Sequence, residues 1–189
     1  MKSFLEFILE EYDEKAFPRK SKIDPTQKRA ITNYMGQGYS YANPKMRSHI
    51  DKLIRTSPWT TKEQTVYRGV TSLPDTDDSG HHTHPHITSY SRNMDVAKEF
   101  TKSSTKPGAI IRLKVPAKSR TFRTEEDDSG EQEQLFRAGS RIKINREPSE
   151  HHVVTTEHHS LDGKVSYHEK KVPIHDAELV DDNTSKKFK

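Results

Sequence analysis

The sequence contains no cysteine among its 189 residues, so it can form neither disulfide bonds nor thiolate zinc sites. It also lacks any apolar run near the roughly 18 residues that a membrane-spanning helix needs, so we expect no membrane partner. Hydrophobic residues are scarce, at 29%, yet the formal net charge is only +4, short of the charge typical of disordered chains. These limits predict a small, loop-rich folded domain, and the absence of cysteine suits a reducing cytosol.

Hydrophobic periodicity predicts two helices near the start of the chain, over residues 25–38 and 43–57. The second places Met46, Ile50, Leu53 and Ile54 on one face. Strands and one further helix follow: strands over 65–70, 86–91 and 108–116, a helix over 92–100, and a strand-like segment over 129–145 in which Leu135 and Phe136 are followed by Ala138-Gly139 and then RIKIN. Three short stretches of the tail, 151–159, 164–174 and 177–180, are expected as edge strands. This order of elements is an α+β pattern.

The helix expected over 92–100 follows directly on a serine, Ser91, which is well placed as its N-cap. Its spacing predicts that Met94, Ala97 and Phe100 turn toward the core, with Val96 as an alternative to Ala97.

Three polar patterns interrupt the apolar strands: Arg68 in VYRGV, Ser89 with Ser91 in ITSYS, and Glu131 with Glu133 in EQE. Each alone has an ordinary structural interpretation, as a snorkelling arginine, a helix cap or a solvated strand face. Together they suit one chemistry. A guanidinium binds phosphate through paired hydrogen bonds, and a carboxylate stabilises the cationic sugar formed when a glycosidic bond breaks. The combination therefore fits a dinucleotide whose ribosyl bond is cleaved.

In this order, the three patterns resemble those of the R-S-E class of mono-ADP-ribosyltransferases, in its arginine-directed branch. The resemblance covers residues 25–146, and EQEQLFRAGSRIKI is especially similar to the enzymes of T-even phages. It implies an α+β domain over 25–182 with the ADP-ribosyltransferase fold, in which two packed, antiparallel-rich sheets are flanked by N-terminal helices. It also implies NAD as the substrate.

The resemblance assigns roles to individual residues. Arg68 would hold NAD through phosphate and ribose, and Ser89 would order the NAD pocket, with Tyr90 and Ser91 completing its motif. Tyr90 departs from the family, since many relatives have a small residue there. Glu133 would be the catalytic glutamate that stabilises the cationic ribose, and Glu131 would orient and deprotonate the acceptor guanidinium.

Two further residues are candidates for contacts with NAD. Gly69, beside the arginine, would permit close approach of the cofactor to the backbone. Phe122 is a candidate for stacking on the nicotinamide ring.

A histidine-rich stretch, HHTHPH at residues 81–86, brings four imidazoles together in a polar segment. Because no carboxylate pattern accompanies them, we expect a solvated loop and no metal site, with contacts to NAD or substrate as the alternative. The same applies to the histidine pairs at 151–152 and 158–159.

The first ten residues, MKSFLEFILE, resemble the capsid-targeting leader of T-even phage internal head proteins. The resemblance implies a propeptide over 1–10, cut after Glu10 by a prohead protease, then a linker over 11–24. It places the protein in the phage capsid and, after injection, in the host cytoplasm; without such a leader the expectation is cytoplasmic. An N-terminal helix packed on the domain is the alternative. Residues 183–189 form a basic tail.

The expected activity is transfer of ADP-ribose from NAD to an arginine of a host protein, with release of nicotinamide, by a monomer without a metal. Two alternatives stay open from the sequence. The same residues would serve an NAD glycohydrolase, which transfers ADP-ribose to water. The basic composition and the leader would also suit a non-catalytic internal protein that binds DNA or a host protein.

Overall fold

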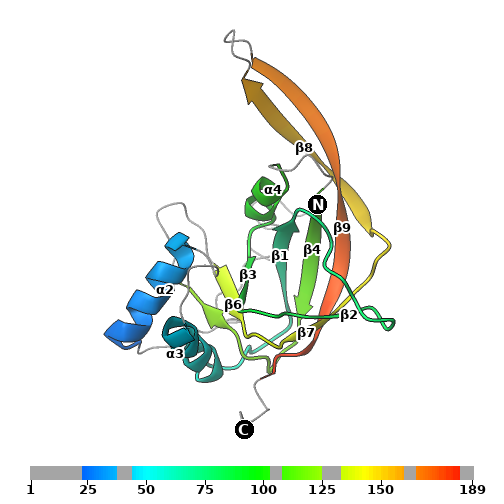
Figure 1. Ribbon diagram of the computed structural model, residues 1–189. Helices are drawn as coiled ribbons and strands as arrows, with labels where there is room; N and C mark the ends of the chain where they lie inside the picture. Colours follow the sequence, from blue (N-terminus) through cyan, green and yellow to red (C-terminus); the bar gives the residue numbers. More distant parts are fainter. Residues whose placement is uncertain (1–22, 38–43, 103–107, 125–132, 160–164, 184–189) are drawn as a thin grey trace, which may run out of the picture.

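The computed structural model describes residues 23–37, 44–102, 108–124, 133–159 and 165–183 (Figure 1). The helices are α2 (Pro25–Gln37), α3 (Pro44–Arg55) and α4 (Met94–Lys102). The strands are β1 (Gln64–Val70), β2 (His81–Thr83), β3 (Thr88–Ser91), β4 (Ala109–Val115), β5 (Phe122–Arg123), β6 (Glu133–Phe136), β7 (Arg141–Ile144), β8 (Glu150–His159) and β9 (Val165–Asp181). In this part of the chain, no helix is long and apolar enough to cross a membrane.

The strands form one mixed sheet in the order β2-β7-β9-β4-β1-β3-β6-β5, with β8 paired to β9. Every pairing is antiparallel except that of β4 with β9. A single residue pair, Tyr67 with Ser91, joins β1 to β3. One buried cluster contains Val66 and Ile111 from one side of this junction and Phe136 from the other, so the two halves of the sheet pack against each other. The predicted α+β class is confirmed, and the two expected layers are the halves of one hydrogen-bonded sheet.

Helices α2 and α3 cover the outer face of the β3–β6–β5 half (Figure 1). On α3, Ile50, Leu53 and Ile54 are completely buried, as their spacing predicts. A capping box starts α2: the Gln27 backbone N–H donates to Asp24 Oδ1 at 2.9 Å, and the Asp24 N–H donates to Gln27 Oε1 at 3.3 Å. Both predicted helices are therefore present, and they bury one face of the smaller half-sheet.

Helix α4 packs on the other half of the sheet, where Ala97 lies among buried residues of β1, β4, β8 and β9. Two predictions about this helix are wrong. Its N-cap is Asn93, whose Oδ1 accepts from the Asp95 N–H at 2.8 Å, while Ser91 Oγ accepts from the Asn93 N–H. Phe100 is 58% exposed rather than buried, because it lines an open cavity beside β1 instead of facing the core.

Strand β9 corrects the prediction of separate edge strands in the tail. Its 17 residues run through the sheet, pairing first with β8 and then with β4 and β7. Pro173, which as a proline has no N–H to donate, sits next to Ile174, where pairing with β4 begins, so the strand tolerates it. The first part of β9 and its partner β8 form a long hairpin that projects from the body (Figure 1).

An ion pair with a buried arginine joins the end of β6 to α3. The Arg137 side chain is fully buried, and its Nε donates to Asp51 Oδ1 on α3 at 2.6 Å. Its Nη1 donates to the backbone carbonyl of Asn183, beyond the end of β9. A buried cation needs such partners, because leaving it uncompensated in the interior costs several kcal/mol.

Replacing Asp51 by alanine should therefore lower the free energy of unfolding by about 3 kcal/mol, measured by urea denaturation. The matched control is Glu63→Ala, which removes the carboxylate of an exposed pair, Glu63 Oε1 to Lys114 Nζ at 3.7 Å. That change should cost less than about 1 kcal/mol. Equal losses in the two variants would contradict the structural role of the buried pair.

Candidate active site

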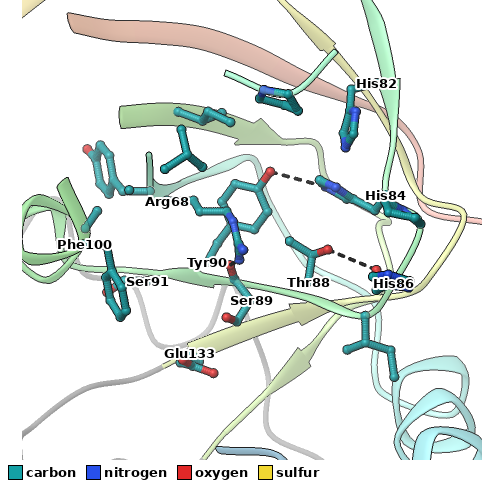
Figure 2. A pocket seen from close by; sticks show the side chains of 18 of the residues that line it. Arg68, His82, His84, His86, Thr88, Ser89, Tyr90, Ser91, Phe100 and Glu133 are labelled. Atoms are coloured by element: carbon teal, nitrogen blue, oxygen red, sulfur yellow. Dashed lines mark hydrogen bonds between the residues drawn. The ribbon is translucent and has the colours of Figure 1, made fainter. Parts of the chain in front are cut away.

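A cavity of about 560 Å³ opens where β1, β3 and the start of β6 meet the end of α4. This volume lies within the range of pockets that hold small molecules and cofactors. The residues that line it include six from the predicted site, which are Arg68, Gly69, Ser89, Tyr90, Ser91 and Glu133. Patterns that are far apart in the sequence thus meet at one place, as Figure 2 shows.

Strand pairing brings these residues together. Ser91 pairs with Tyr67 of β1 on one side and with Glu133 of β6 on the other. The three strands therefore lie side by side at Ser91, with Arg68 one residue beyond the junction on β1. Ser91 is buried and supports the turn into α4, whereas Ser89 is only half-buried at the cavity. Of the two serines, Ser89 is better placed to contact a ligand.

Arg68 is half-buried, and its Nη1 donates to the backbone carbonyl of Ser89 at 2.6 Å. Its Cζ lies 6.0 Å from the centre of the Tyr90 ring. Among the described residues, no carboxylate lies within ion-pair distance of it. A guanidinium has five N–H donors, so most remain for an anionic ligand in the cavity.

Glu133 stands at the first position of β6, where its backbone is held by Thr124. The Thr124 N–H donates to the Glu133 carbonyl at 3.0 Å, and the Glu133 N–H donates to Thr124 Oγ1 at 3.0 Å. These bonds fix the glutamate backbone at the edge of the cavity. Glu131 lies outside the described residues, so its position relative to Glu133 stays a prediction.

Gly69 lines the cavity, but the packing of α4 already accounts for its lack of a side chain. A Cβ on this residue would lie 2.0 Å from the carbonyl oxygen of Ala97 on α4. Only glycine allows the helix to approach β1 this closely. Close approach of the cofactor to this residue stays a prediction.

Phe122 is not brought to the site. It is 2% exposed and packs beneath α2 and α3 with Ile54 and Leu135, and it is not among the described residues that line the cavity. Phe100 lines the cavity instead, with an exposed ring on the last turn of α4. The sequence missed this residue because its helical spacing pointed to the core.

The histidine-rich stretch is more structured than predicted. Residues 81–83 form β2 and pair with β7, and His82, His84 and His86 line the cavity. His84 is 4% exposed, and its Nε2 lies 3.3 Å from the hydroxyl of Tyr90 (Figure 2). The alternation of histidines at every second residue was the available signal, since strand residues i and i+2 share a face.

Burial sets the protonation states of this pair. It lowers the pKa of His84 to about 3, with smaller contributions from His82 and the positive charge of Arg68. Burial raises the pKa of Tyr90 above its ordinary value, although Arg68 opposes this shift. At neutral pH both side chains are therefore neutral, and Arg68 keeps the positive charge at this wall.

This arrangement of sheet, helices and cavity is the ADP-ribosyltransferase fold. One similar solved structure is exoenzyme S from Pseudomonas aeruginosa in complex with human 14-3-3 protein beta and bound to Carba-NAD (TM-score 0.56, 11% identity, covering 83% of this chain and 74% of that one). Another is the enzymatic component C2-I of the C2-toxin from Clostridium botulinum (TM-score 0.54, 17% identity, covering 90% of this chain and 46% of that one). A third is the C3larvin toxin, an ADP-ribosyltransferase from Paenibacillus larvae (TM-score 0.50, 13% identity, covering 84% of this chain and 88% of that one).

At these identities the likeness establishes a shared fold, and this chain spans less than half of C2-I. No protein-family model and no curated protein matches the sequence.

The depressed pKa of His84 makes stability depend on pH. Because the unfolded chain, with an ordinary histidine pKa near 6.5, binds more protons between about pH 3 and 6.5, the free energy of unfolding should fall as the pH falls through this window. In His84→Gln, which does not titrate, the dependence should be shallower. Urea denaturation at several pH values compares the two slopes, and identical slopes would contradict the buried neutral state.

Proposed function

We propose that this chain is a mono-ADP-ribosyltransferase that transfers ADP-ribose from NAD to an arginine side chain of a protein and releases nicotinamide. The observation that carries the proposal is the meeting of Arg68, Ser89 and Glu133, from three different strands, at one cavity. The fold supports it, because a similar structure, exoenzyme S, is bound to Carba-NAD.

NAD presents a diphosphate, two riboses and two ring systems, and the cavity offers a matching group for its charge. Arg68 supplies guanidinium donors that no described carboxylate neutralises, so the diphosphate is its natural ligand. Ser89 adds a hydroxyl beside it. In the proposed complex these two residues hold the dinucleotide, and the reacting ribose extends toward Glu133.

In the proposed reaction the bond between the ribose C1′ and the nicotinamide nitrogen breaks, and its electron pair leaves with nicotinamide. The ribose becomes cationic, and the Glu133 carboxylate stabilises that charge. A guanidinium nitrogen of the acceptor then attacks C1′ and loses a proton. Glu131, two residues upstream, is the proposed group that orients the guanidinium and takes the proton.

The proposed acceptor is a protein of a bacterial host. It follows from the sequence resemblance to T-even phage enzymes and from the leader-like residues 1–10, which lie outside the described residues. In the same proposal, the chain is carried in the phage head and acts in the host cytoplasm. Residues 25–182 would form the catalytic domain.

Incubation with labelled NAD and a bacterial lysate tests the reaction. Wild-type protein should label discrete protein bands and release nicotinamide, and Glu133→Gln should lower both at least about 100-fold, because the charge that stabilises the cationic ribose is gone. Glu147→Gln, which changes an exposed carboxylate outside the cavity, should retain activity. If the wild type neither labels protein nor releases nicotinamide, the proposal is wrong and the result favours the non-catalytic binding protein.

Glu131→Gln separates transfer from hydrolysis. Since Glu131 is assigned to the acceptor and not to the ribose, the variant should still release nicotinamide from NAD but should no longer label protein. Nicotinamide release and protein labelling are measured in the same reaction. Loss of both activities would contradict this division of roles, and wild-type release without any labelling would identify an NAD glycohydrolase.

A further inference from the structure

Tyr90 lies directly under the proposed ligand-binding arginine. Its ring is 1% exposed and packs edge-on against Phe136, with ring centres 5.1 Å apart. The Arg68 guanidinium lies over the ring, with Cζ 6.0 Å from its centre, a distance at which a cation is attracted by the ring face. Tyr90 is thus both a core residue and the residue over whose ring the Arg68 guanidinium lies.

The hydroxyl of Tyr90 distinguishes it from an ordinary core aromatic. A buried hydroxyl without a partner costs free energy, so phenylalanine would fill this place more simply. His84 supplies the partner, with Nε2 at 3.3 Å from the hydroxyl oxygen, and the two rings lie 5.8 Å apart. This hydrogen bond fixes the orientation of the Tyr90 ring beneath Arg68.

His84 is itself held on both sides of its backbone. Its N–H donates to the carbonyl of Ser140 at 2.9 Å, and its carbonyl accepts from the Gly139 N–H at 2.7 Å. Both partners belong to the turn that follows β6. These two bonds fix the backbone that carries the imidazole beside this turn.

We propose that His84 and Tyr90 are positioning residues for Arg68: the hydrogen bond between them holds the ring that sets the guanidinium against the Ser89 carbonyl and directs its other donors into the cavity. The inference rests on the proposed function for the identity of the ligand, the diphosphate of NAD. Neither residue is assigned a contact with the reacting bond, and both act through Arg68.

The test uses Tyr90→Phe and His84→Leu in the full chain, each of which removes the hydrogen bond but keeps the packing volume. Calorimetric titration should show ADP-ribose binding weakened about threefold to tenfold, and the KM for NAD should rise by a similar factor, with kcat changed less than about twofold. Inhibition by nicotinamide, which has no phosphate, should be unchanged. His84→Gln, whose amide can still bond the hydroxyl, should restore ADP-ribose affinity.

His175→Leu is the matched control. His175 is also a buried histidine, 5% exposed, and its Nδ1 lies 3.1 Å from the carbonyl oxygen of Asn145, outside the residues that line the cavity. Its replacement should leave ADP-ribose binding at the wild-type value. Thermal unfolding of every variant shows whether it folds. If His84→Leu does not fold, the test relies on Tyr90→Phe, which is the milder change.

The outcomes separate the inference from the proposed function. Wild type that binds ADP-ribose while Tyr90→Phe and His84→Leu bind it equally well overturns the positioning role alone. The positioning role is also overturned if His175→Leu loses as much ADP-ribose affinity as His84→Leu, or if nicotinamide inhibition falls in parallel. A general destabilisation of the fold would then explain the result. Wild type that binds neither ADP-ribose nor NAD overturns the proposed function itself.

Discussion

The backbone pairing of Tyr67 with Ser91 is the constraint on which the site depends. It is the single register pair between β1 and β3, although β1 pairs along its whole length with β4 and β3 along its whole length with β6. Had the antiparallel ladder continued, the carbonyl of Ser89 would have met a backbone donor of β1. Instead it accepts from the side chain of Arg68. The strands separate after one pair, the cavity opens between them, and the arginine satisfies the carbonyl that the separation leaves exposed.

The same contact distinguishes this arginine from the structural ones. Arg112 donates to Asp176 and Glu150, and buried Arg137 donates to Asp51. Each of these cations has its charge compensated within the fold. Arg68 instead meets a neutral carbonyl, so its charge stays available to a ligand. Its neighbour His84 is buried as a neutral imidazole, so His84 adds no positive charge to this side of the cavity.

Local sequence patterns were sufficient to predict the elements that do not depend on distant partners. The spacing of Ile50, Leu53 and Ile54 gave a helix face, and the periodicity of residues 25–38 predicted α2. The three polar patterns also identified the strands that meet at the cavity. Each pattern alone was ambiguous. Their shared chemistry and their order along the chain indicated a common site, although no local pattern shows the contact between them.

What the sequence did not show depends on pairing across long separations. The charged, proline-containing tail looked like edge strands, since nothing local indicates that β9 takes β8 as its partner up to Ile174 and β4 from Ile174 onward. Phe100 has the helical spacing of a core residue, but it lines the open cavity, which no local pattern indicates. His84 was expected in a solvated loop, but its backbone pairs with the turn after β6 and its side chain is buried.

The separation of Arg68 and Glu133 on different strands has a consequence for catalysis. In the proposed reaction Arg68 meets a diphosphate whose charge is the same before and during bond breaking, so it contributes equally to binding the ground state and the transition state. Glu133 meets a charge that develops only as the nicotinamide bond breaks, so its contribution is largest at the transition state. Each is held by a different neighbour: Arg68 donates to the Ser89 carbonyl on β3, and the Glu133 N–H donates to Thr124 Oγ1, just after β5. If the proposed reaction is right, substrate affinity would depend on the support of the arginine and the rate on the start of β6, so each could be altered separately.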